Sequence, residues 1–223
     1  MSSPKGPSLA KGNAWKKWEA MCLVCLREAL ENLRQMSPLP EHENSLNQRL
    51  NKLIQAVADV RYRERTEVIR PECPNPHADD DEASANRLTP APDLRWGYRD
   101  TQAGITRDFV IECKRLRCVV GPSPLRVSRD YVREGIVRFH DKSKGYGRDV
   151  KSGAMVGYVQ SGGLDEHLCE VNKTLIKVSL PELAIFGALR RSGISELKHT
   201  FPRPFGMSPF DLLHFWVDLR DAE

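Results

Sequence analysis

The chain has 223 residues, a mass of 25.3 kDa, a formal net charge of +4 and an isoelectric point near 8.7. Apolar residues make up 40% and charged residues 29%, which excludes a membrane protein and a wholly disordered chain. The longest apolar run near the N-terminus, residues 21–26, is too short for a signal peptide or a spanning helix. We therefore expect a cytoplasmic protein with no membrane partner.

The first 62 residues predict a flexible arm followed by two helices. Residues 1–12 are polar and rich in Ser, Pro and Gly, which is typical of an arm, and we expect residues 13–223 to form a single domain. Apolar residues at helical spacing predict a helix from Asn13 to Met36 and a second beginning near Glu43. The C-x-x-C of Cys22 and Cys25 lies in the first helix and lacks a second ligand pair, so we interpret both as buried thiols.

The rest of the chain mixes strands and helices. Residues 71–92 combine five prolines with an acidic run, and we interpret them as a solvated acidic loop. Two strands are expected over 93–98 and 107–115, joined by a turn near 100–104. The remaining predicted elements are a helix over 128–139, a basic loop over 140–152, a strand over 154–159 and a helix over 164–178. Residues 210–217 form either a last strand or a short helix, and we prefer the strand.

The residues best suited to chemistry lie in the second predicted strand. Alternate residues of a strand share a face, so Glu112 and Lys114 point to the same side. In a hairpin whose opposed residue numbers sum to 205, Asp93 lies opposite Glu112, with the two Cβ atoms about 5 Å apart. Such carboxylates repel unless a divalent cation lies between them, and oxygen ligands suit Mg²⁺. Asp108 shares this face and is a rival to Asp93, but it lies four residues before Glu112, roughly 13 Å away along the strand.

The dipeptide Pro92-Asp93, followed by Glu112-x-Lys114 in an apolar strand, resembles the PD-(D/E)XK nuclease superfamily. The resemblance implies an α/β fold with a restriction-endonuclease-like αβββαβ core and an N-terminal helical extension, with one further strand within residues 60–70. It implies Mg²⁺ or Mn²⁺ held by Asp93, Glu112, Glu43 and the backbone carbonyl of Cys113. Lys114 would orient or deprotonate the attacking water. The implied catalytic residues are Asp93, Glu112, Lys114 and Glu43.

The charge pattern favours DNA as the partner. Residues 114–151 contain eleven Lys and Arg and four acids, a net charge of +7, whereas residues 64–93 carry −5. A basic stripe beside a metal site suits a phosphate backbone. We predict backbone contacts from Arg138, Lys142, Lys144 and Arg148.

Residues 131–139 and 153–158 are similar to those of bacterial nuclease-like proteins of phage-defence loci, which implies partner subunits of a defence complex or a homo-oligomer. RNA is the alternative substrate. The second hypothesis is a non-catalytic subunit that binds nucleic acid or docks on a partner and only retains the fold, with Trp15 and Trp18 available for docking. We interpret His199 and His214 as structural histidines.

Overall fold

The computed structural model describes residues 9–63, 91–100, 105–117, 126–185 and 193–220. The N-terminal half contains helices α1 (Leu9–Arg34) and α2 (Glu43–Arg61) and strands β1 (Leu94–Asp100) and β2 (Ile105–Leu116). A continuous helical segment follows, made of α4 (Arg126–Asp130), the π-helical η1 (Tyr131–Ile136) and α5 (Val137–His140). The chain then forms β3 (Ser152–Val159), α6 (Leu164–Lys177), β4 (Ala184–Ile185), β5 (Ile194–Phe201) and β6 (Phe210–Asp218).

The six strands form one mixed sheet in the order β1-β2-β3-β6-β5-β4. The β2–β3 and β3–β6 pairs are parallel and the other three pairs are antiparallel. The predicted hairpin register is confirmed, because Leu94 lies opposite Ile111 and Asp100 opposite Ile105. The four strands predicted from the sequence are confirmed as β1, β2, β3 and β6, whereas β4 and β5 were not predicted. The protein is therefore of mixed α/β class.

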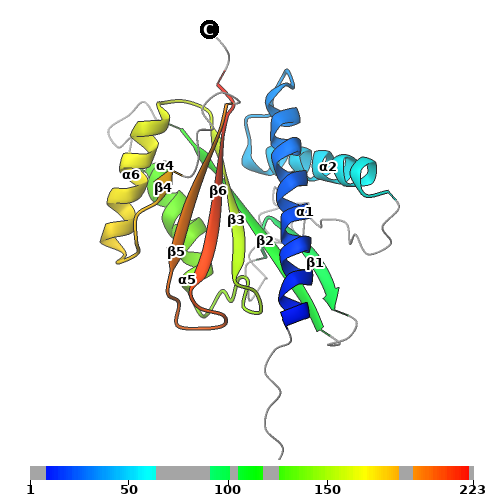
Figure 1. Ribbon diagram of the computed structural model, residues 1–223. Helices are drawn as coiled ribbons and strands as arrows, with labels where there is room; N and C mark the ends of the chain where they lie inside the picture. The colour runs from blue at the N-terminus through cyan, green and yellow to red at the C-terminus, as the bar shows by residue number, and fades with distance from the viewer. Residues whose placement is uncertain (1–8, 64–90, 101–104, 118–125, 186–192, 221–223) are drawn as a thin grey trace, which may run out of the picture.

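Helices cover both faces of the sheet (Figure 1). On one face, Arg27 of α1 pairs with Glu196 of β5 and lies 5.6 Å from the ring centroid of Phe215. On the other face, Tyr131 of η1 packs edge-on against Trp216 with centroids 5.8 Å apart. Phe215 and Trp216 are neighbours in β6, so strand alternation separates their side chains between the two faces.

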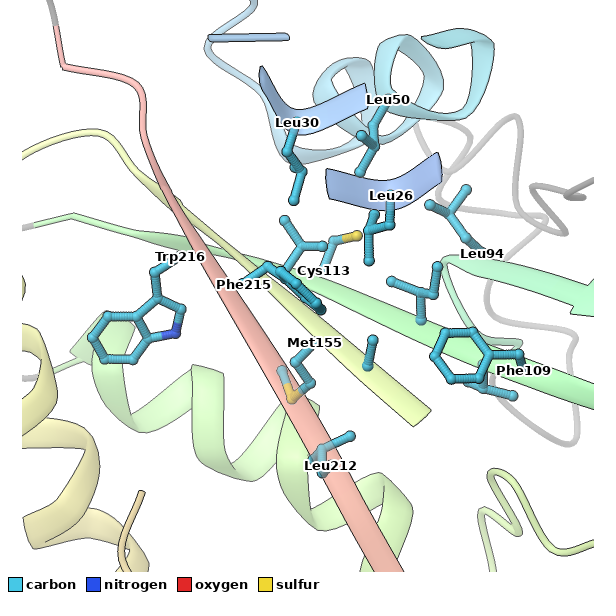
Figure 2. Close-up of a cluster of buried hydrophobic side chains, with 14 of the residues drawn as sticks. Leu26, Leu30, Leu50, Leu94, Phe109, Cys113, Met155, Leu212, Phe215 and Trp216 are labelled. Atoms are coloured by element: carbon cyan, nitrogen blue, oxygen red, sulfur yellow. The ribbon is translucent and has the colours of Figure 1, made fainter. Parts of the chain in front are cut away.

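The core under α1 and α2 joins leucines of both helices to the middle of the sheet. Figure 2 shows Leu26, Leu30 and Leu50 beside Cys113 and Phe215, and all five are fully buried. Burying such side chains is the main stabilising contribution to a fold, about 1.5–3 kcal/mol for each large apolar residue.

Cys22 and Cys25 are buried free thiols in α1, which confirms the interpretation from the sequence. Burial raises the pKa of Cys25 to about 11, with the charge of Glu28 adding to the effect. No helix among the described residues is long and apolar enough to cross a membrane.

Two boundaries differ from the prediction. Helix α1 begins at Leu9, so residues 9–12 belong to the helix and not to the arm expected over 1–12. Leucine, alanine and lysine are good helix formers, which allows α1 to extend before the capping signal at Asn13. Of the strand expected within 60–70, residues 60 and 61 end α2 and residues 64–70 lie outside the described residues. The acidic loop also lies outside them, apart from residues 91 and 92.

Candidate active site

Strands β1 and β2 bring Asp93 and Glu112 together at the end of their ladder. The last paired residues are Leu94 and Ile111, so the register continued by one step places Asp93 opposite Glu112. The carboxylate of Asp93 accepts the backbone N–H of Cys113 at 2.8 Å, which fixes it against β2. Glu112 is fully buried in the middle of the sheet.

Lys114 contacts each of the four groups that were expected to hold the metal ion. Its Nζ donates to Glu43 Oε1 at 2.8 Å and to the backbone carbonyl of Cys113 at 2.8 Å. The same nitrogen lies 3.2 Å from Glu112 Oε1 and 3.7 Å from Asp93 Oδ2. The ammonium group therefore lies among the four groups that were expected to hold a metal ion.

Glu43 reaches the strands from the N-terminus of α2, of which it is the first residue. Its Oε2 accepts the backbone N–H of Arg115 at 3.0 Å, so its two carboxylate oxygens bind two neighbouring residues of β2. The Glu43 side chain is 25% exposed and that of Asp93 16%, against 0% for Glu112. The cluster therefore opens to solvent on the side of Glu43 and Asp93.

Arg138 is a member of this cluster that the sequence analysis assigned elsewhere. It was predicted to contact a DNA backbone, but its NH1 donates to Glu112 Oε1 at 2.6 Å. Its side chain is only 20% exposed, because the helical segment that contains it packs on the face of β2 that presents Glu112. A clue was present in the sequence: Arg138 follows Gly135 by three residues, and Gly135 is an inward position of the same helix.

Burial and mutual repulsion change the protonation of the cluster. Burial is the main cause that raises the pKa of Glu112 to about 8, followed by the charge of Asp93, while Lys114 and Arg138 oppose the shift. Burial likewise raises the pKa of Asp93. Burial alone would lower the pKa of Lys114, but Asp93, Glu112 and Glu43 outweigh it and raise that pKa. Lys114 is therefore an ammonium donor, and burial opposes ionisation of Glu112 while the two neighbouring cations favour it.

The donor set fits a divalent cation by its chemistry. Three carboxylates face two side-chain cations, and Glu112 Oε2 is buried with no hydrogen-bond partner in the described part of the chain. Oxygen donors of this kind suit Mg²⁺ or Mn²⁺. Across the described residues, no three His, Cys, Asp or Glu side chains form a ready-made metal cage.

The other predicted nucleic-acid contacts lie in the loop between α5 and β3. We call residues 141–151 the basic loop. Lys142, Lys144 and Arg148 are exposed there. Lys144 and Arg148 line a groove of about 380 Å³ that also includes Pro92, the neighbour of Asp93, whereas Lys142 is not among the lining residues. The structure therefore places two of the four predicted DNA contacts in a groove that also contains the residue before Asp93.

His199 lies on β5 and His214 on β6, where the register places His214 two strands across the sheet from Glu112. Both are buried on neighbouring strands, and the hydroxyl of Tyr131 lies 2.8 Å from His214 Nδ1. Burial lowers the pKa of His199 to about 4 and that of His214 well below its usual value, so both are neutral at pH 7. Their place among core side chains agrees with a structural role.

Comparisons with protein families, with curated proteins and with solved structures found no match to this chain.

Proposed function

We propose that the chain is a metal-dependent nuclease that hydrolyses phosphodiester bonds of DNA. The observation that supports it most is the meeting of Asp93, Glu112, Lys114 and Glu43 within one cluster. Glu43 begins α2, Asp93 directly precedes β1, and Glu112 and Lys114 lie in β2, so the cluster joins three separate segments of the chain. We propose a restriction-endonuclease-like core on the same grounds, supported by an antiparallel strand pair, a helical segment and a parallel third strand in that order.

In this proposal, Asp93, Glu112, Glu43 and the Cys113 carbonyl would hold Mg²⁺ or Mn²⁺. The bound cation would supply charge neutralisation at the scissile phosphate and a water of lowered pKa. Lys114 donates hydrogen bonds to oxygen atoms, and its raised pKa suits it to stabilise developing negative charge better than to remove a proton. Arg138 binds Glu112 Oε1, and Oε2 has no hydrogen-bond partner among the residues that the structure describes.

DNA is the proposed substrate because the basic segment adjoins the carboxylates. Lys144 and Arg148 line the groove that begins beside Asp93, and cations there would bind phosphates with an affinity that falls as salt rises. RNA remains the alternative, and cleavage of matched labelled DNA and RNA strands would distinguish the two. The cytoplasmic location and the phage-defence setting stay predictions.

One observation favours the second candidate, a non-catalytic subunit that retains the fold. Lys114 and Arg138 already neutralise most of the carboxylate charge, as a purely structural ion-pair cluster would. The candidates differ in one measurable property, because a structural cluster needs no cation. Calorimetric titration of the chain with Mg²⁺ and with Mn²⁺ is therefore the first experiment.

The second experiment is plasmid cleavage by the wild type, Glu112→Gln and Lys114→Met, each with Mg²⁺ and with EDTA. The matched control is Glu196→Gln, since Glu196 is also a buried strand carboxylate paired with an arginine, but on the opposite face of the sheet. We expect cleavage to require the cation, to fall at least ~100-fold in both site variants and to persist in the control. Equal cleavage by the wild type and Glu112→Gln would show that the site is assigned wrongly.

A further inference from the structure

The groove beside the carboxylates has two walls from different parts of the fold. One wall is the face of the β1–β2 hairpin, including Arg95, Asp108 and Val110, and the other is the basic loop with Lys144 and Arg148. Asp108, Val110 and Glu112 alternate along β2, so they share a face, and Glu112 lies about 7 Å beyond Val110. The groove includes Pro92, which precedes Asp93, and Val110, the same-face neighbour of Glu112, so a strand of nucleic acid lying along it would pass beside the carboxylate cluster.

The basic loop has no regular secondary structure, and a single buried arginine binds its backbone. Arg203 NH1 donates to the carbonyl of Tyr146 at 3.0 Å, and NH2 donates to the carbonyls of Gly147 and Val150 at 2.7 and 2.8 Å. Arg203 Nε donates to the carbonyl of Met207 at 2.7 Å. The guanidinium thus joins the basic loop to the turn between β5 and β6, and Figure 1 shows the two segments side by side at the lower end of the sheet.

Two further contacts hold the same turn against Arg148. The N–H of Met207 donates to the carbonyl of Arg148 at 3.2 Å. Gly206 has φ = +61°, and a Cβ placed there would lie 2.4 Å from that carbonyl oxygen, so glycine is required for the close approach. Phe205 lies between two guanidinium groups, with its ring centroid 4.9 Å from Arg203 Cζ and 6.0 Å from Arg148 Cζ.

We propose that Arg203 is a positioning residue for substrate binding: it fixes the basic loop so that Lys144 and Arg148 hold the phosphate backbone of a nucleic acid along the groove to Glu112. This inference rests on the proposed function. Arg203 does not touch the substrate. Burial lowers its pKa to about 10, so it stays charged at neutral pH, and its planar fork satisfies four carbonyls at once. Lysine at this position keeps the charge but cannot make the same set of bonds.

The experiment compares Arg203→Lys and Gly206→Ala with the wild type and with a matched control, Arg220→Lys. Arg220 also donates to a loop carbonyl, that of Gly162, but it follows β6 at the opposite end of the sheet from the basic loop. The measurements are the affinity for a fluorescent DNA duplex in EDTA, kcat and KM for cleavage with Mg²⁺, and hydrogen exchange of residues 141–151.

We expect both loop variants to weaken DNA affinity and raise KM by about tenfold, with kcat within about threefold of the wild type and faster exchange in the basic loop. Arg220→Lys should match the wild type. If Arg203→Lys fails to fold, Gly206→Ala decides by the same measurements. If the wild type cuts DNA and a folded loop variant keeps the wild-type affinity and KM, the inference is overturned and the proposed function stands. A wild type that neither binds nor cuts DNA would overturn both.

Discussion

The Glu112→Gln substitution removes a fully buried carboxyl group whose pKa burial and Asp93 raise to about 8. In the unfolded chain that pKa is near 4.5. Between these two values the folded protein retains a proton that the unfolded chain has released, so the free energy of unfolding falls as pH rises. The contribution of Glu112 to the free energy of unfolding is therefore most favourable below pH 4.5 and is lost progressively between pH 4.5 and pH 8. Glutamine, which does not titrate, removes this pH dependence.

One pKa unit corresponds to 1.36 kcal/mol, so the difference in unfolding free energy between Glu112→Gln and the wild type should grow by about 3 kcal/mol from pH 5 to pH 8. For a chain of this length, that is a relative rise of roughly 6–12 °C in Tm. Lys114 and Arg138 have raised pKa values and stay charged over this range, and their attraction for the ionised Glu112 is already contained in its pKa of about 8.

The assay is thermal unfolding followed by circular dichroism at pH 5, 6, 7 and 8, with EDTA present throughout to remove divalent cations. We expect the Tm of Glu112→Gln, measured against that of the wild type at each pH, to rise steadily. A difference that stays constant within about 2 °C across the four pH values would refute the argument that Glu112 is held protonated by its surroundings.

Three stability predictions test the surrounding fold. Tyr131→Phe removes the hydroxyl that accepts from Trp216 Nε1 at 2.9 Å and contacts His214, so it should cost about 1–3 kcal/mol in urea unfolding; a wild-type midpoint would contradict this. Leu26→Ala should cost about 2–5 kcal/mol, with Val60→Ala, at a 73% exposed position, as the near-neutral control; equal losses would mean that α1 does not pack as described. Gly157→Ala places a Cβ 2.6 Å from the Trp216 ring and should cost about 1–3 kcal/mol, visible in calorimetry, whereas an unchanged Tm would show that the ring can shift freely.

The carboxylate cluster could be predicted because its geometry is mostly local. Strand alternation places Glu112 and Lys114 on one face, and a short turn sets the register that brings Asp93 opposite Glu112. Glu43 was placed by resemblance, since nothing in the sequence near it indicates that α2 begins beside Arg115.

Arg203 and strand β5 could not be predicted because their roles depend on packing between distant segments, and Arg138 was assigned to the surface although its spacing from Gly135 pointed inward. The charge of Arg138 favours a surface position, and only the packing of η1 on β2 turns it toward Glu112. The buried faces of β5 include Glu196 and His199, which obscure the apolar alternation that identifies a strand. Arg203 lies 53 or more positions from each loop carbonyl that it binds, so no local pattern indicates the contact.

The two buried strand glutamates, Glu196 and Glu112, differ in how their carboxylate oxygens are satisfied. Glu196 has both oxygens satisfied by one partner, since Arg27 Nε and NH2 donate to Oε1 and Oε2. Glu112 is more deeply buried, yet Arg138 and Lys114 both approach Oε1 and leave Oε2 without a hydrogen-bond partner among the described residues. An unsatisfied buried oxygen costs about 1–3 kcal/mol or more, and folds tolerate such a cost mainly where function requires it. The asymmetry at Glu112 is therefore an argument for cation binding that the number of charges in the cluster alone would not provide.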